Sequence, residues 1–176
     1  SSLTLVDDPT NVAAFTATAS DGEGLATRRN VLVEDGRLLR FVHNNYTGRR
    51  SGGASTGSAV RGYASTPGVG IQALVLTPGT RTQAEIVADV ADGLLVQGVS
   101  GLHSGVNPVS GDFSTGAEGL RIREGALAEP VREFTIASTI QKMLQDVLEV
   151  GGDLEWLPMR TAGVSLVIGD VTVSGA

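Results

Sequence analysis

Two stretches of apolar residues, each interrupted at its centre by an acidic residue and a glycine, give the clearest structural pattern in the chain. One spans 30–43 with Asp35-Gly36 at its centre, and the other spans 119–132 with Glu124-Gly125 at its centre. A pair of this kind between β-prone runs favours a type I′ hairpin turn, because both central residues must take positive φ. The pattern therefore predicts two antiparallel hairpins.

Two further segments carry apolar residues at helical spacing. The first follows a capping box formed by Thr82 and Glu85 and ends at Gly93, where a left-handed cap belongs. The second covers roughly 138–150 and stops at the glycine pair 151–152. Both apolar stripes are typical of helices that pack on a sheet, so we interpret these helices as scaffold.

The remaining apolar runs predict strands at 3–7, 71–76, 94–99 and 164–173. With 176 residues and a hydrophobic fraction of 41%, the chain has the length and composition of one globular domain, 1–176. The predicted fold class is α+β, with a curved mixed or mostly antiparallel β-sheet and two main α-helices.

A glycine-rich segment, 98–119, lies between two of these apolar runs and is the first candidate for a functional site. Its glycines permit positive φ, and its proline fixes its own backbone and extends the residue before it. The segment is either a structured loop that joins two strands or a loop that shapes a substrate cleft. Its candidate substrate-binding residues are Gly105, Asn107, Pro108, Gly111 and Asp112.

A second segment, 46–61, combines glycines and hydroxyl residues with arginines. Such a composition resembles an anion cradle, but it lacks the Gly-Lys-Ser/Thr ending of a P-loop. A mobile surface loop is one interpretation, and a loop that meets a peptide backbone or carboxylate through arginine is the other. The candidate residues are Arg49, Ser55, Thr56, Gly57 and Arg61.

Composition excludes several classes of function. The net charge of −6 disfavours direct binding to a nucleic-acid backbone. The absence of cysteine excludes disulfides and thiolate zinc sites, and no apolar run is long enough for a membrane helix. The chain begins with Ser1 rather than Met, which suggests a processed or truncated chain.

Catalytic patterns are weak in this chain. Its two histidines, His43 and His103, fall on separate predicted elements, whereas a catalytic zinc normally needs three protein ligands. Ser104 and Ser110 lie near His103 and Asp112 in sequence, yet no Gly-x-Ser-x-Gly elbow is present. The residues alone indicate a non-catalytic scaffold with two glycine-rich loops.

Long ordered motifs nevertheless resemble the C-terminal domain of the TldD/PmbA family. The resemblance extends along the whole chain. It rests chiefly on 105–119, 122–125 and 130–136, supported by shorter matches at 7–9, 21–24, 30–36, 55–57, 61, 78–79, 150–153 and 173–175.

The resemblance implies a cytoplasmic bacterial or archaeal metalloprotease subunit of a family once described as modulators of DNA gyrase. Two paralogues, the TldD type and the PmbA (TldE) type, form a heterodimer in this family and degrade or trim unfolded peptides. The family's zinc belongs to the TldD type, through a His-Glu-x-x-x-His helix and a cysteine. This sequence has neither, and the neighbourhood of that cysteine reads Pro158-Met-Arg-Thr-Ala-Gly163 here.

The resemblance and its departures together imply a PmbA-like subunit that holds no metal in this chain. Zinc would be supplied by a partner or by a segment upstream of Ser1, and the chain is not expected to be catalytic by itself. The expected partners are a TldD-like paralogue or a second copy, and an unfolded peptide. The alternative is a truncated part of a catalytic zinc metallopeptidase whose metal-binding helix lies upstream of Ser1. A family member is more than twice this length, so an N-terminal domain is expected there.

Overall fold

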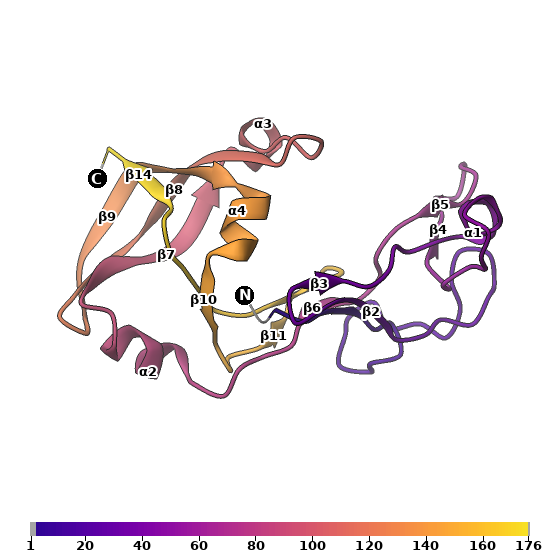
Figure 1. Ribbon diagram of the computed structural model, residues 1–176, viewed down its shortest axis with the longest axis horizontal. Helices are drawn as coiled ribbons and strands as arrows, with labels where there is room; N and C mark the ends of the chain where they lie inside the picture. The colour runs from indigo at the N-terminus through magenta and orange to yellow at the C-terminus, as the bar shows by residue number, and fades with distance from the viewer. Residues whose placement is uncertain (1–2, 176) are drawn as a thin grey trace. The chain divides into compact units, whose positions relative to one another are not determined.

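The computed structural model describes residues 3–175, which divide into two compact units (Figure 1). We call residues 3–78 together with Leu154–Val164 the N-terminal unit. We call Gly79–Asp153 together with 165–175 the hairpin unit. The described residues include many strands, most of them short, and four short helices, with more sheet than helix. The predicted α+β class is therefore confirmed, but the strands form several separate sheets instead of the single sheet that we expected.

The N-terminal unit is built on a four-stranded antiparallel sheet in the order β3-β2-β1-β6. Its strands are β1 (Leu5–Asp7), β2 (Asn30–Glu34), β3 (Arg37–Leu38) and β6 (Leu74–Leu76). Around it lie helix α1 (Asn45–Arg50) and two small hairpin sheets, β4 (Ala59–Val60) with β5 (Gly68–Val69) and β11 (Glu155–Trp156) with β12 (Ala162–Gly163). The first predicted hairpin is confirmed at its turn, where Asp35 and Gly36 have φ of 48° and 75°. Its returning strand covers only Arg37–Leu38, not the predicted 37–43.

Polar side chains occupy much of the interior of this unit. Asp7 and Asn30 face each other in the β1–β2 register, and both are fully buried. Asp7 Oδ1 accepts hydrogen bonds from the backbone N–H of Gln72 (2.9 Å) and Ala73 (2.7 Å). Asn30 Nδ2 donates to the carbonyl oxygens of Arg28 and Thr56. These bonds tie distant loops to the central strands, because a buried backbone group must find a partner.

The hairpin unit is built on a second antiparallel sheet, in the order β14-β9-β8-β7. Its strands are β7 (Asp92–Ser100), β8 (Asp112–Arg123), β9 (Ala126–Thr139) and β14 (Thr172–Ser174). The unit also contains α2 (Gln83–Ala88), α3 (Leu102–Gly105), α4 (Ile140–Gln145) and the paired strands β10 (Val147–Val150) and β13 (Leu166–Ile168). Figure 1 shows the long β8–β9 hairpin with α3 at one end.

The second predicted hairpin is confirmed and is longer than the sequence indicated. Glu124 and Gly125 take φ of 48° and 78° at the turn. The buried cluster of this sheet consists of Ala117, Phe134 and Ile136. Apolar burial of this kind contributes about 25 cal/mol per Å² of area removed from water.

The second predicted helix, 138–150, is wrong over more than half of its length. Thr139 is the last residue of β9 and the N-cap of α4. Its hydroxyl accepts a hydrogen bond from the backbone N–H of Lys142. The helix stops at Gln145, and the chain then pairs as β10 with β13. The apolar stripe had helical spacing, but Val147 is buried through this strand pairing, and tertiary contacts override a local preference.

The predicted loops are also shorter than expected. Residues 98–100 belong to β7 and 112–119 belong to β8, so only 101–111 depart from the strands. The glycine at position 119 serves close packing, because a Cβ there would lie 2.0 Å from the Leu95 carbonyl oxygen. In the other predicted loop, 46–61, the structure has α1, which begins with a capping box between Asn44 and Thr47.

Three other elements differ slightly from their predicted bounds. Helix α2 has the predicted capping box at Thr82 but ends at Ala88 instead of reaching Gly93. Strands β1 and β6 begin later than the predicted 3–7 and 71–76. In the part of the chain that the structure describes, every helix is too short and too polar to traverse a lipid bilayer.

Replacing Asp7 by alanine should destabilise the N-terminal unit by about 3 kcal/mol, because two buried N–H groups lose their acceptor. The measurement is urea unfolding followed by the fluorescence of Trp156, the single tryptophan of the chain, which lies in this unit. The exposed Glu34→Ala control should stay within about 0.5 kcal/mol of the parent. An Asp7→Ala change as small as the control's would show that these hydrogen bonds contribute little.

Candidate functional site

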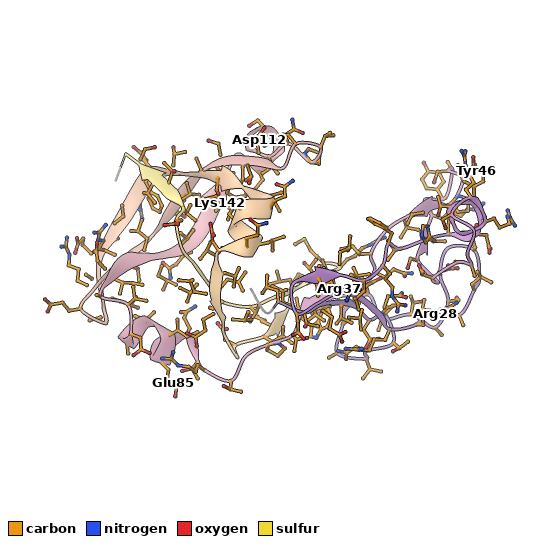
Figure 2. All side chains as sticks on the ribbon, in the orientation of Figure 1. Arg28, Arg37, Tyr46, Glu85, Asp112 and Lys142 are labelled. Atoms are coloured by element: carbon orange, nitrogen blue, oxygen red, sulfur yellow. The ribbon has the colours of Figure 1, made fainter. Side chains whose placement is uncertain are left out.

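An open cleft of about 600 Å³ lies between α3 and β8 in the hairpin unit. It forms where the chain leaves β7 at Ser100, makes the single turn of α3, and returns along β8. Figure 2 labels Asp112 beside this turn. The lining residues are Ser100, Gly101, Ser104, Gly105, Asn107, Asp112, Ser114, Thr115 and Gly116.

Two glycines allow the walls of the cleft to approach each other closely. A Cβ atom on Gly105 would lie 2.0 Å from the carbonyl oxygen of Ser114, and one on Gly116 would lie 2.6 Å from Ser100 Oγ. The Ser100 side chain could rotate away, but a backbone carbonyl cannot, so α3 can approach β8 this closely only with glycine at position 105. Gly101 begins α3 with φ of 78°, a conformation that also favours glycine.

The turn 107–112 closes one end of the cleft and is held by its own hydrogen bonds. The N–H of Asn107 donates to the Asp112 carbonyl oxygen (2.9 Å), and that of Gly111 donates to the Asn107 carbonyl oxygen (2.8 Å). Asn107 Oδ1 accepts from the N–H groups of Val109 and Ser110. Pro108 lies within this turn and is exposed. The side chain of Asn107 therefore shapes the turn, as short polar residues commonly do.

Helix α4 supports the same turn from outside the cleft. The N–H of Ile140 donates to the carbonyl oxygen of Gly111 (2.8 Å), and Gln141 Nε2 donates to that of Ser110 (3.3 Å). Gly111 has φ of 82°, and a Cβ there would lie 2.0 Å from Gln141 Oε1. The predicted site residues of this segment are thus held by packing and hydrogen bonds on both sides.

The chemical character of the cleft is set by hydroxyl groups and one carboxylate. Asp112 is the only charged residue among those that line it. Its Oδ2 accepts a hydrogen bond from Ser110 Oγ (2.6 Å). Thr115 is 2% exposed, and its Oγ1 has no hydrogen-bond partner within residues 3–175.

The predicted site residues of the N-terminal unit fall into two groups. Ser55, Thr56 and Gly57 are engaged by their own unit: both hydroxyls donate to the carbonyl oxygen of His43, and Ser55 Oγ accepts from the N–H of Gly57. Arg49, at the end of α1, and Arg61, after β4, are exposed. The turn 55–57 is thus held by hydrogen bonds within its unit, whereas the two arginines are exposed to solvent.

The structure therefore places the two sets of predicted site residues in different units. Gly105, Asn107 and Asp112 line one cleft, whereas Arg49, Ser55, Thr56, Gly57 and Arg61 belong to the N-terminal unit. The predicted role of both sets in binding a peptide substrate stays a prediction. Ser100, Ser114 and Thr115 were not predicted, and Ser104 was considered only as a nucleophile, although serine and threonine recur along the same segment.

Neither histidine belongs to a three-residue group of potential metal ligands within residues 3–175. Among residues 3–175, no three His, Cys, Asp or Glu side chains gather closely enough to hold a metal ion. His43 Nδ1 lies 3.2 Å from the hydroxyl of Thr47, and His103 is exposed on α3. This donor set does not match the three protein ligands of a catalytic zinc.

Shifted pKa values occur at ion pairs and caps outside the cleft. A hydrogen bond to Asp89 raises the pKa of Arg81, and the backbone N–H of Thr82 lowers the pKa of Glu85. None of these side chains lines the cleft. Their pKa shifts therefore result from ion pairing and helix capping and do not indicate chemistry at the site.

Comparisons with known proteins agree with this architecture. The chain matches the family described as PmbA/TldA metallopeptidase C-terminal domain over residues 1–175. It is 32% identical to Metalloprotease PmbA homolog from Haemophilus influenzae and 28% identical to Metalloprotease PmbA from Escherichia coli O157:H7, in each case over 98% of this chain and 36% of the relative. TldE from Thermococcus kodakarensis superimposes with a TM-score of 0.91 and 31% identity, over 99% of this chain and 40% of that chain.

A crystal structure described as a putative modulator of a DNA gyrase, from Thermotoga maritima, gives the same TM-score of 0.91 at 28% identity, over 98% of this chain and 39% of that chain. The fold is thus that of a metallopeptidase-family C-terminal domain. The chain belongs to the PmbA/TldD family, and it spans 36% of the length of the two PmbA relatives.

Replacing Thr115 by valine should leave the free energy of unfolding unchanged or raise it by about 1 kcal/mol, because the lost hydroxyl has no partner. Urea unfolding followed by circular dichroism measures the change. The matched control is Thr139→Val, whose hydroxyl caps α4, and it should lose about 1 kcal/mol. A loss at Thr115 equal to that at Thr139 would mean that the buried hydroxyl has a partner after all.

Proposed function

We propose that this chain is the C-terminal domain of a PmbA/TldE-like subunit that holds no catalytic metal and helps to position unfolded peptides in a TldD/TldE-type metalloprotease complex. The family and the relatives named as metalloproteases support the general activity. The structural likeness to TldE supports the subunit type.

The observation that carries the proposal is the donor set of the chain. It has no cysteine and two histidines, and its described residues contain no group of three potential ligands. The zinc of the complex would therefore reside in a TldD-like paralogue, or in a segment upstream of Ser1. In the second case the protein would be a catalytic metallopeptidase, which is the alternative function.

The glycine-rich cleft would contribute contacts to the peptide. Its walls are fixed before a ligand arrives, through Gly105, Gly116 and the turn 107–112. A preformed site loses less conformational entropy on binding. Asp112 would contact the peptide directly, whereas Asn107 would act by holding the turn.

The N-terminal unit would contribute a second set of contacts. Arg49 and Arg61 are exposed, and arginine matches carboxylates and backbone carbonyl oxygens well. The buried turn 55–57 would keep its own loop in place. The complex would act in the cytoplasm, with a TldD-like paralogue or a second copy as the partner.

The protein at its full natural length, purified alone, should contain less than about 0.1 zinc per chain and should not cleave an unfolded peptide. Cleavage should appear when a TldD-type paralogue is added. Metal analysis by mass spectrometry and a fluorogenic peptide assay give the two readouts. Stoichiometric zinc together with cleavage by the protein alone would establish the catalytic alternative instead.

A further inference from the structure

We propose that the cleft between α3 and β8 is a subsite for a primary ammonium group of the peptide, either its N-terminal amine or a lysine side chain. This inference rests on the proposed function, since it names the part of the peptide that the cleft would bind.

The charge of the cleft favours a cation. The nine lining residues include one carboxylate, Asp112, and no lysine or arginine. Lys142, on the nearby helix α4, forms ion pairs with Asp146 and Asp170. A peptide carboxylate placed here would meet Asp112 without a compensating cation, whereas an ammonium would gain a favourable interaction.

The acceptors suit a primary ammonium, which carries three N–H donors and no acceptor. Asp112 Oδ2 is engaged by Ser110, while Oδ1 has no hydrogen-bond partner within the described chain. Ser104 Oγ donates to the carbonyl oxygen of Gly101 (3.2 Å), so its lone pairs are available to an incoming N–H. The hydroxyls of Ser100 and Ser114 line the same cleft.

Short side chains line the cleft where its walls approach each other. Because Gly105 lies directly against Ser114, and Gly116 against Ser100, the cleft has no side chain beyond a short hydroxyl at these points. Short side chains bring the acceptors close to the backbone of β8. A compact ammonium at the end of a slender chain can reach them.

The experiment measures binding of three unstructured decapeptides to the full-length protein in complex with its TldD-type partner. The first peptide has a free N-terminus and no lysine, the second is acetylated and has no lysine, and the third is acetylated and has one central lysine. Fluorescence polarisation of a C-terminal dye gives each dissociation constant. The variants are Asp112→Asn and Glu118→Gln, which neutralise carboxylates on the same strand inside and outside the cleft.

With the parent and with Glu118→Gln, at least one ammonium-bearing peptide should bind about fivefold more tightly than the acetylated lysine-free peptide, a preference in the range of an exposed ion pair. Asp112→Asn should abolish that preference. A preference for the first peptide identifies an N-terminal amine, and one for the third identifies lysine.

Equal affinity for all three peptides, or a preference that survives Asp112→Asn, would overturn the inference. Cleavage of the acetylated lysine-free peptide by the complex, measured in parallel, separates this result from a failure of the proposed function. If that peptide is bound and cleaved without any ammonium preference, the proposed function stands and the subsite does not.

Discussion

The contact between Gly105 and the backbone of Ser114 is the constraint on which the candidate site depends. At this point the single turn of α3 lies so close to β8 that a Cβ atom would be 2.0 Å from a carbonyl oxygen. Strand β7 therefore ends its pairing with β8 at Ser100. The chain pairs with β8 again only at the antiparallel bridge between Val106 and Phe113. The cleft is the space that this interruption leaves. Its shape follows from backbone contacts, and its chemistry follows from the short side chains around them.

The N-terminal unit uses a different principle, because its loops are tied by buried polar side chains. Asp7 holds the N–H groups of Gln72 and Ala73, and Asn30 holds the carbonyl oxygen of Thr56. Asp7 Oδ2 and Asn30 Oδ1 are buried without a partner in the described chain. A buried polar group without a partner destabilises the fold, whereas a fully hydrogen-bonded network favours one arrangement of the chain. These hydrogen bonds hold the turn 55–57 in place, whereas Arg49 in α1 and Arg61 after β4 are exposed to solvent.

Local signals in the sequence predicted the hairpin turns well. Asp35-Gly36 and Glu124-Gly125 adopt the positive φ that the residue types favour, and Thr82 with Glu85 forms the expected capping box. These features depend on neighbouring residues, so the sequence displays them. The second helix was overextended, because the burial of Val147 in a strand pair depends on Ile168, which is distant in the sequence.

The candidate site was predicted only in part, for a related reason. Gly105, Asn107 and Asp112 were identified from their segment, and all three line the cleft. Glycines within strands were interpreted as loop residues, because a turn and a close approach of two backbones both favour glycine. The lining residues Ser100 and Gly116 were not identified, because only the β7–β8 register pairs them.

The central claim is that a substrate amine reaches this cleft, and photo-crosslinking tests it most directly. An unfolded peptide with a diazirine on the residue next to its free N-terminus, and a second with a diazirine on the residue next to a single lysine, would each be irradiated with the complex, and the modified residues would be found by mass spectrometry. The account predicts that at least one of the two labels residues within 100–116, and that an excess of the matching unlabelled peptide prevents it. Labelling by both peptides that is confined to other parts of the complex would contradict the account.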